Sequence, residues 1–211
     1  IRLLWRDGDW ILVGVLFDPP TFPVSRLAEF RYDPETNQAH MLRILETDNP
    51  KRFEKNWMPP HVATDHFEYV YSDTQIYRGG KILGEPSGPE YRMEGGKKIS
   101  AIHGGTQLLE IEEGYLAMMH DVVFTPIYGY SPAHFGYRTI QMRSYRHYFV
   151  RFDENGFAQR RSEPFTIRKP GVEFASGIVQ DGDDVLISFG IADIASGLLR
   201  IPLKDALELV G

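Results

Sequence analysis

The sequence predicts an all-β fold of the β-propeller type. A unit made of an apolar strand, a short polar turn and a second apolar strand recurs four times in the 211 residues. The four turns lie near positions 8, 66, 114 and 182, about 58, 48 and 68 residues apart, which is close to the length of a four-stranded blade. Only the segment from Leu203 to Val210 has a helical pattern, and it could equally be a last strand with a short turn.

The turns of these units have the chemistry of tight hairpins. Three of them place glycine after an acidic residue, between two apolar runs: Asp7-Gly8, Glu113-Gly114 and Asp181-Gly182. Glycine supplies the positive φ that such turns require. The second unit is a weaker copy, and its turn is predicted at Asp65-His66.

Further strand pairs lie between these hairpins. They are predicted at 28–33 with 39–45 and at 145–153 with 157–161. From Tyr145 to Phe152, aromatic and aliphatic residues alternate with Arg and His. This pattern predicts a strand with one solvent-facing side.

Two Gly- and Pro-rich segments, 79–96 and 125–136, are too long for plain hairpin connections and are expected to be loops. They carry Tyr, Arg and His residues. Because loops on a rigid scaffold are where binding groups usually lie, we expect part of a ligand site there. No linker divides the chain, so 1–211 is predicted to form a single domain.

Composition excludes several classes of function. The formal net charge is −6 without any run of Lys and Arg, so neither nucleic acid nor a membrane is expected as a partner. No stretch approaches the roughly 18 apolar residues of a membrane-spanning helix, and the charged start is unlike a signal peptide, so a cytoplasmic location is expected. The absence of cysteine excludes disulfides and thiolate chemistry. The chain enters an apolar run at Ile1 without a methionine, from which we expect further residues upstream.

The second strand of each hairpin runs into an acidic residue. These residues are Asp18, Asp73, Asp121 and Asp193. Equivalent strand ends converge around the axis of a propeller, so a ring of Asp with nearby Ser, His and aromatic residues could form a ligand funnel. The alternative is that aspartate merely ends strands and begins turns.

A cation, an amide and a large aromatic ring stand together at Lys55, Asn56 and Trp57. Such a mixture suits a sugar or phosphate site. Lysine can bind an anion, asparagine can hydrogen-bond vicinal hydroxyls, and tryptophan can offer an apolar face to a pyranose. In the alternative interpretation Trp57 belongs to the core, and Lys55 is a solvent-exposed residue beside it.

The third hairpin is preceded by Gly104-Gly105 and ends at His120. A Gly-Gly pair before a strand indicates close approach of another backbone, or a bulge. The functional interpretation places Thr106 and Gln107 at the rim of a ligand site. In this interpretation His120 donates a hydrogen bond to an anion or carries a proton. Alternatively, His120 is a histidine satisfied within the core.

Several catalytic templates are missing from the sequence. There is no Gly-x-Ser-x-Gly motif, no phosphate-binding Gly-rich loop followed by Lys-Ser or Lys-Thr, and no dinucleotide fingerprint. Apart from His61, Asp65 and His66, the seven histidines show no metal-ligand spacing. Neither a metal nor a cofactor is therefore expected.

Short motifs are spread over nearly the whole chain: Arg2-Leu3 with Asp7-Gly8, Lys55-Asn56-Trp57-Met58-Pro59, Gly104-Gly105-Thr106-Gln107, 115–120, 148–153, Ser162-Glu-Pro-Phe165, Glu173-Phe-Ala-Ser-Gly177 and 188–193. Together they resemble the blade motifs of the mannoside phosphorylases and hydrolases of glycoside hydrolase family 130, closest to remote relatives that occur alone or beside glycosyltransferases. The resemblance implies a five-bladed β-propeller whose first blade is incomplete in this chain. It also implies reaction on a β-mannoside in a central funnel, with phosphate or water as the attacking species.

The resemblance also implies roles for single residues. By motif position, Lys55 resembles the family's phosphate-contacting lysine and His120 its phosphate-contacting histidine. Arg26 could match a further phosphate-contacting arginine. Phe189 stands where the phosphorylases usually have tyrosine, which removes a hydroxyl from the implied phosphate site.

The family's catalytic acid lies in a Glu-Asp-Pro-Arg motif, and this chain enters at what resembles the arginine of that motif, Arg2. The acid is therefore expected either upstream or not at all. Asp193 matches the acidic residue of the last blade motif. Inversion at an anomeric carbon needs a proton donor for the leaving oxygen, so the position of the acid decides between enzyme and binding protein.

Two main hypotheses follow. The first is a glycoside phosphorylase or hydrolase in which Lys55 and His120 hold the anion or nucleophile. The second is a non-catalytic module that binds a glycan through Trp57, Tyr115 and the loop aromatics, in a glycosyltransferase assembly for example. A third, glycosyl transfer from an activated donor, lacks a recognisable diphosphate site. The expected ligands are an oligosaccharide or a sugar phosphate, with inorganic phosphate as a further candidate.

Overall fold

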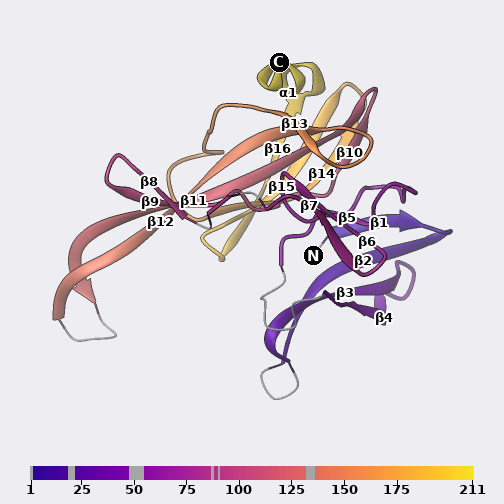
Figure 1. Ribbon diagram of the computed structural model, residues 1–211, viewed down its shortest axis with the longest axis horizontal. Coiled ribbons are helices and arrows are strands. Elements are labelled where there is room, and N and C mark those ends of the chain that lie inside the picture. The colour runs from indigo at the N-terminus through magenta and orange to yellow at the C-terminus, as the bar shows by residue number, and fades with distance from the viewer. Residues whose placement is uncertain (1, 19–21, 48–54, 87, 90, 132–135) are drawn as a thin grey trace.

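The computed structural model describes residues 2–18, 22–47, 55–86, 88–89, 91–131 and 136–211. The all-β prediction is confirmed, since the described chain forms four successive antiparallel sheets with one short helix (Figure 1). Each sheet is built mainly from strands that are neighbours in sequence, as hairpin chemistry at the turns dictates.

The first sheet is a meander of β1 (Arg2–Arg6), β2 (Asp9–Asp18), β3 (Phe22–Asp33) and β4 (Gln38–Leu45). β1 and β2 turn at Asp7 and Gly8, both with positive φ, so the first predicted hairpin is confirmed. The predicted pairing of 28–33 with 39–45 is also confirmed, as β3 with β4.

The second sheet contains β5 (Tyr69–Val70), β6 (Gln75–Arg78) and β7 (Lys81–Gly84). An antiparallel bridge between Met58 and Val70 adds the segment after Asn56 to its edge. The turn predicted at Asp65-His66 is wrong, because the hairpin turns at 71–74. There the Thr74 N–H donates to the Ser72 hydroxyl, and serine stabilises turns in this way without glycine.

The third sheet is the largest and holds the strands that build the candidate site. Its order is β13–β12–β11–β9–β8, with β10 paired to the start of β11. The Glu113-Gly114 hairpin and the pairing of 145–153 with 157–161 are confirmed. The strands are β8 (Tyr91–Glu94), β9 (Lys97–Ser100), β10 (Leu109–Ile111), β11 (Gly114–Ser131), β12 (Gly136–Phe152) and β13 (Ala158–Arg161).

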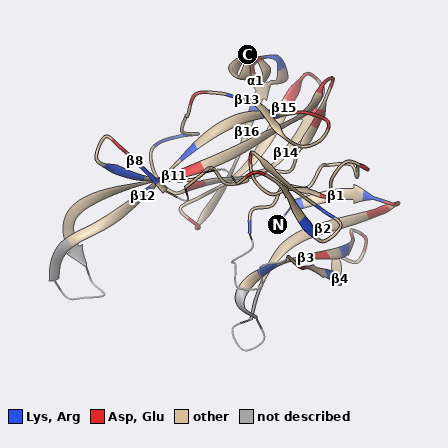
Figure 2. Cartoon of the chain, viewed as in Figure 1, with Lys and Arg blue, Asp and Glu red and all other residues tan. Residues whose placement is uncertain are grey.

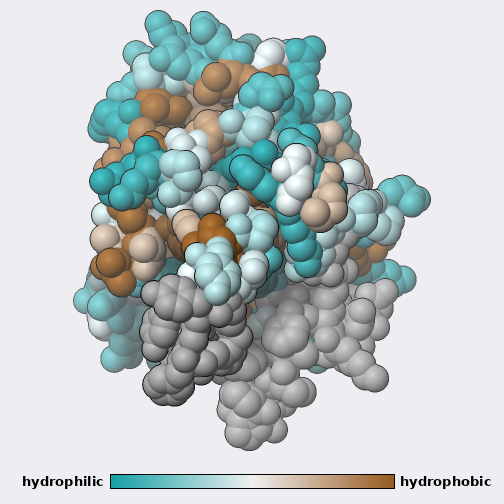
Figure 3. Space-filling view, turned by 90° about the vertical axis from the view of Figure 1, so that its left-hand side faces the viewer, coloured by the Kyte–Doolittle hydropathy of each residue, from teal (hydrophilic) through white to brown (hydrophobic). Residues whose placement is uncertain are grey.

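β11 and β12 continue beyond the body of the molecule as a two-stranded ribbon, at the left of Figure 1. We term residues 125–131 and 136–142 the arm. Met93 beside its base and Tyr128 on it are 70% and 76% exposed. Viewed from this side, small hydrophobic patches lie among hydrophilic residues (Figure 3).

The loops predicted at 79–96 and 125–136 are wrong where the structure describes them. Residues 125–131 belong to β11, and 79–96 holds β7, β8 and two Gly-Gly turns with positive φ. Glycine and proline suggested loops here. A hairpin, however, uses Gly-Gly as its turn, and an edge strand tolerates proline.

The fourth sheet contains β14 (Glu173–Asp181), β15 (Asp184–Ile191) and β16 (Ala195–Pro202), and it confirms the Asp181-Gly182 hairpin. The last segment is the helix α1 (Leu203–Val210), which buries Ala206 and Val210. Over the described residues, no helix has the length and apolar character needed to cross a membrane.

Among the described residues, three hydrophobic clusters hold the sheets together. β12 supplies Tyr148 and Val150 to one cluster and Phe149 to another. Consecutive residues of a strand point to opposite faces, so both faces of this part of β12 are covered. The prediction that the strand has one solvent-facing side is therefore wrong.

A buried carboxylate joins the first sheet to the second. Glu29 on β3 is fully buried and accepts hydrogen bonds from Arg6, Arg43 and the Tyr69 hydroxyl. Burial alone would raise the pKa of this carboxyl. The hydrogen bonds from Arg43, Arg6 and Tyr69 outweigh burial and lower the pKa to about 2.

Candidate functional site

A cleft of about 320 Å³ lies where the third sheet meets the segment before Trp57 and the start of β14. Most of its wall comes from the third sheet, near the base of the arm. The lining residues are Lys55, Asn56, Tyr91, Ser100, His103, His120, Val122, Phe124, Arg143, Tyr145 and Phe174.

The floor of the cleft is one face of the third sheet. Residues two apart on a strand share a face, and residues opposite each other on paired strands lie side by side. β11 contributes His120, Val122 and Phe124, which lie opposite His147, Tyr145 and Arg143 of β12. The antiparallel pairing of β11 with β12 thus fixes which side chains face the cleft.

The cleft is cationic although the protein carries a formal net charge of −6. Lys55 and Arg143 line it together with His103 and His120. Among the described residues that line it, none is Asp or Glu. Cations gathered in a hollow with low-dielectric walls focus a positive potential, so this arrangement favours an anionic ligand.

A buried guanidinium adjoins the cleft. The Nε of Arg2 donates to the Gly105 carbonyl at 2.8 Å, and its Cζ lies 6.0 Å from the ring centre of Phe174. Its Nη2 is buried and has no hydrogen-bond partner in the described part of the chain. Burial lowers the pKa of Arg2 to about 10, so the group remains charged at neutral pH. An unpaired buried charge is costly, and an anion in the cleft would offset that cost.

His120 is also buried, and it lines the cleft. Its Nδ1 has no hydrogen-bond partner among the described atoms, and its ring stacks on that of Tyr145 at 5.1 Å. Burial, together with the nearby His103, His147, Arg2 and Lys55, holds the pKa of His120 well below 6.5. The imidazole is therefore neutral at pH 7 and can hydrogen-bond a ligand without carrying charge.

Three of the residues singled out from the sequence meet in this cleft: Lys55, Asn56 and His120. Arg2 adjoins them. Asn56 has a φ of 66°, a conformation that asparagine tolerates better than most residues. A Cβ on Gly104 would lie 1.9 Å from the Asn56 carbonyl oxygen, so the close backbone approach predicted from Gly104-Gly105 is confirmed.

Trp57 lies in the core instead of the cleft. Its side chain is 1% exposed, and its ring packs against three tyrosine rings at centroid distances of 5.8, 5.3 and 4.7 Å, those of Tyr69, Tyr71 and Tyr77. A ring enclosed in this way has no face open to a sugar. It anchors the segment that carries Lys55 and Asn56.

Thr106 and Gln107 are buried between sheets and do not line the cleft. The Thr106 hydroxyl accepts from the Met118 N–H and donates to the Gln107 carbonyl. The Gln107 side-chain amide donates to the Ile178 carbonyl at 2.7 Å and accepts from the Ile178 N–H at 3.3 Å. These contacts join the third sheet to the fourth.

The structure does not gather the predicted acidic residues in the cleft. Asp121 lies on β11 between His120 and Val122, so it points to the opposite face, where Arg146 and Arg92 pair with it. Asp193 is exposed on the turn between β15 and β16. Asp73 lies outside the cleft lining.

Two further predicted positions lie in the first sheet. Arg26 is half-buried on β3, where its Nη1 donates to the Ser25 carbonyl, and it does not line the cleft. The Asp18 side chain lies outside the described residues.

Part of a ligand site was expected in segment 79–96, and its Tyr91 does line the outer part of the cleft. Phe124 and Arg143, which line the same part, were not predicted from the sequence. A signal was present, because His120, Val122 and Phe124 alternate with residues of the other face. This period-two alternation on both sides of the Thr125–Gly136 segment is typical of strands that continue into it, as β11 and β12 do. No group of three or more His, Asp or Glu residues in the described chain is placed to hold a metal.

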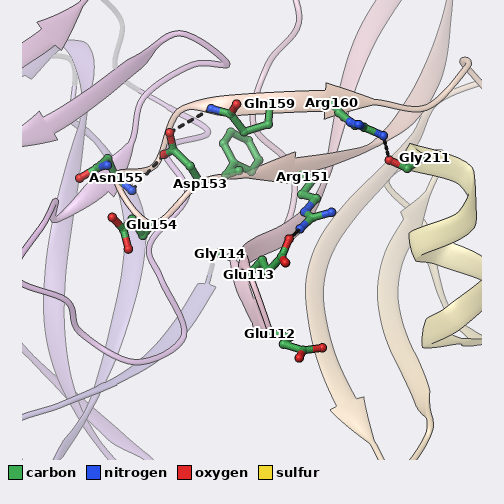
Figure 4. Close-up of a pocket in the computed structure, with 11 residues that line it drawn as sticks. Glu112, Glu113, Gly114, Arg151, Asp153, Glu154, Asn155, Gln159, Arg160 and Gly211 are labelled. Carbon is green, nitrogen blue, oxygen red and sulfur yellow. Dashed lines mark hydrogen bonds and ion pairs between the residues drawn. The ribbon is translucent and has the colours of Figure 1, made fainter.

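A larger hollow of about 750 Å³ lies at the other end of the third sheet, beside the Glu113-Gly114 turn (Figure 4). Several of its charged groups already have partners. Arg151 pairs with Glu113, Gln159 donates to Asp153, and Arg160 donates to the Gly211 carbonyl. Glu112 and Glu154 also line this hollow, so its unpaired charge is negative, in contrast to the cationic cleft.

The successive antiparallel sheets define a fold that the chain shares with carbohydrate-active enzymes of known structure. It superposes on a β-1,2-mannobiose phosphorylase from Listeria innocua, solved with β-1,2-mannobiose, with a TM-score of 0.61 and 12% identity over 99% of this chain and 59% of that one. A glycosyl hydrolase from Bacteroides ovatus matches with a TM-score of 0.57 and 13% identity over 96% of this chain and 64% of that one. The chain thus spans about three-fifths of each. No protein-family model and no curated protein matches the sequence.

Proposed function

We propose that this chain is the anion- and sugar-binding part of a carbohydrate-active protein that acts on the glycosidic bond of a β-mannoside. The observation that carries the proposal is the cationic cleft, in which Lys55, Asn56 and His120 meet beside the buried Arg2. The fold shared with a mannobiose phosphorylase supports the choice of substrate class. In this proposal the four sheets belong to a five-bladed propeller, and 1–211 forms one domain.

The residues of the cleft suit one part of a phosphorolysis, the binding of the attacking phosphate. A phosphate oxygen forms a bond to the anomeric carbon, the glycosidic bond to the leaving oxygen breaks, and that oxygen takes up a proton. Lys55 and Arg2 would attract the phosphate, and the neutral His120 would hydrogen-bond it. The proton donor is assigned to a residue outside the described cleft lining, which includes no carboxyl group.

Binding without catalysis is the second candidate, favoured by that same lack of a carboxyl group among the described lining residues. The formation of mannose 1-phosphate distinguishes the enzyme from the binding module. Incubation with β-1,2-mannobiose and inorganic phosphate yields mannose 1-phosphate if the chain is a phosphorylase. A binding module retains the disaccharide intact.

Calorimetric titration with mannose 1-phosphate tests the shared step, anion binding in the cleft. Replacing Lys55 by methionine removes a charge while keeping an apolar side chain, and we expect the affinity to fall about tenfold or more. Lys204→Met on α1 is the control, because this exposed lysine lies outside the cleft lining. Equal affinities of Lys55→Met and the parent protein would overturn the proposal.

A further inference from the structure

The outer end of the cleft has a chemistry different from that of the inner end. The rings of Tyr91 and Phe124 meet edge to face with centroids 6.1 Å apart. The Nζ of Lys98 lies 3.5 Å from the ring centre of Tyr91 and 5.9 Å from that of Phe124, and the Cζ of Arg143 lies 6.0 Å from the Phe124 ring centre. Two aromatic rings and two cations thus form one cluster, which we term the outer cluster.

Asp121 and Glu94 lie on the face of these strands opposite to Lys98 and Arg143. Lys98 lies opposite Phe124, which in turn lies opposite Arg143, so all three share the cleft face. On β8, Arg92 and Glu94 occupy the other face, as Asp121 does on β11. In the described part of the chain, no ion pair joins Lys98 or Arg143 to a carboxylate. Figure 2 shows Lys and Arg segments around β8, beside the base of the arm.

We propose that the outer cluster is a subsite for an acidic sugar unit, a pyranose that carries a carboxylate or a phosphate group. This inference rests on the proposed function, because it places the acidic unit next to the sugar held at the inner end. Aromatic rings contact the apolar face of a pyranose, and Lys98 and Arg143 supply counter-charge for its acidic group. A neutral sugar would contact the rings and leave both cations without a counter-charge.

The spacing along β11 fits a ligand of more than one unit. Phe124 lies four residues beyond His120, which corresponds to about 14 Å of strand. This distance leaves room for a sugar ring between an anion at His120 and a second unit at the outer cluster. Val122 and Tyr145, which are paired with each other, line the cleft between these two ends.

Three disaccharides that differ at one carbon test the subsite: β-mannosyl-1,4-glucose, β-mannosyl-1,4-glucuronate and β-mannosyl-1,4-glucose 6-phosphate. We expect at least one acidic disaccharide to bind about tenfold more tightly than the neutral one. Lys98→Met with Arg143→Met should abolish that preference, so that the variant binds all three disaccharides with affinities within about twofold of one another. A preference for the glucuronate identifies a carboxylate as the group bound, and a preference for the 6-phosphate identifies a phosphate.

Lys97→Met is the matched control, because Lys97 is the neighbouring residue of β9 and lies on the opposite face. It should keep the preference. Equal binding of all three disaccharides, or a preference that survives in the double variant, overturns the subsite. If the parent protein also fails to bind mannose 1-phosphate, the proposed function fails as well, so the two failures are distinguishable.

Discussion

His147 is buried on β12, and neither of its ring nitrogens has a hydrogen-bond partner in the described structure. Burial lowers the pKa of this imidazole to about 4, although the nearby Glu173 acts in the opposite direction. The native state therefore holds His147 neutral below pH 6.5, whereas the unfolded chain takes up a proton there. Stability is lost as the pH falls from about 6.5 to about 4, by an amount on the order of 3 kcal/mol.

His147→Leu should remove this part of the acid sensitivity. At pH 7 the free energy of unfolding of the variant should lie within about 1 kcal/mol of that of the parent protein, since leucine is apolar and close in volume to the neutral imidazole that it replaces. Urea denaturation at pH 7.5, 6 and 5 measures the difference, and the free energy of the variant should fall less steeply. The exposed His40, replaced by leucine, is the control and should leave the slope unchanged. A variant with the parent's slope would contradict the assignment.

At the level of single residues, the sequence identified the inner end of the cleft better than the outer end. Lys55, Asn56 and His120 were distinguished by residue type and motif, and they meet. Trp57 was ambiguous because a large aromatic ring suits both a sugar site and a core, and local sequence does not show which rings pack against it. Phe124 was missed because the predicted strand ended at Asp121 and the residues from Thr125 on were expected to form a loop, whereas β11 continues through both.

Among the elements, the segment around Gly104 fixes how the entrance to the second sheet meets the third. Gly104→Ala would place a methyl group 1.9 Å from the Asn56 carbonyl oxygen, and backbone cannot move aside as a flexible side chain can. We expect a loss of roughly 1 to 3 kcal/mol in stability and a tenfold or greater loss of affinity for mannose 1-phosphate. Denaturant unfolding measures the loss of stability. Calorimetric titration with mannose 1-phosphate, at a temperature where the variant is folded, measures the loss of affinity separately.

Gly171→Ala is the control for this substitution, since a methyl group there would meet only the Lys169 carbonyl oxygen, at 4.0 Å. It should change neither quantity appreciably. Unchanged ligand affinity in Gly104→Ala would show that the position of Asn56 does not depend on this contact.

The hairpins with an acidic residue before glycine could be predicted because turn chemistry is local. The second hairpin could not, since its turn relies on Ser72 and its first strand has two residues, Tyr69 and Val70. Pairing of so short a strand is decided by the neighbouring Met58 and by the core, which are tertiary contacts. The arm was missed for the related reason that proline and glycine within a strand lower its apparent propensity.

For the molecule as a whole, the Glu29 cluster couples two sheets. Glu29→Gln keeps the shape of the side chain and removes the charge that Arg6 and Arg43 neutralise. We expect a loss of about 3 kcal/mol at pH 7, measured by denaturant unfolding. Because the carboxyl pKa is lowered to about 2, its contribution is present above pH 4.5 and lost as the pH falls toward 2.

The variant should therefore lose less stability than the parent protein between pH 4.5 and 2. Glu35→Gln, at an exposed position of the β3–β4 turn, is the matched control and should behave like the parent protein. A loss at pH 7 as small as that of the control would mean that the two sheets associate without this ion pair.

The antiparallel pairing of β11 with β12 also decides whether the ligand site is positively or negatively charged. This pairing is unbroken from Tyr115–Phe152 to Ser131–Gly136. Side chains change face at every residue, so inserting a single residue into β11 between its inner and outer halves would turn its outer half over. An insertion before His120 would instead bring Asp121 to the cleft face, where a carboxylate would replace a neutral imidazole. Natural variation in the length of this ribbon is therefore expected to come in steps of two residues, a parity rule that homologous sequences will display.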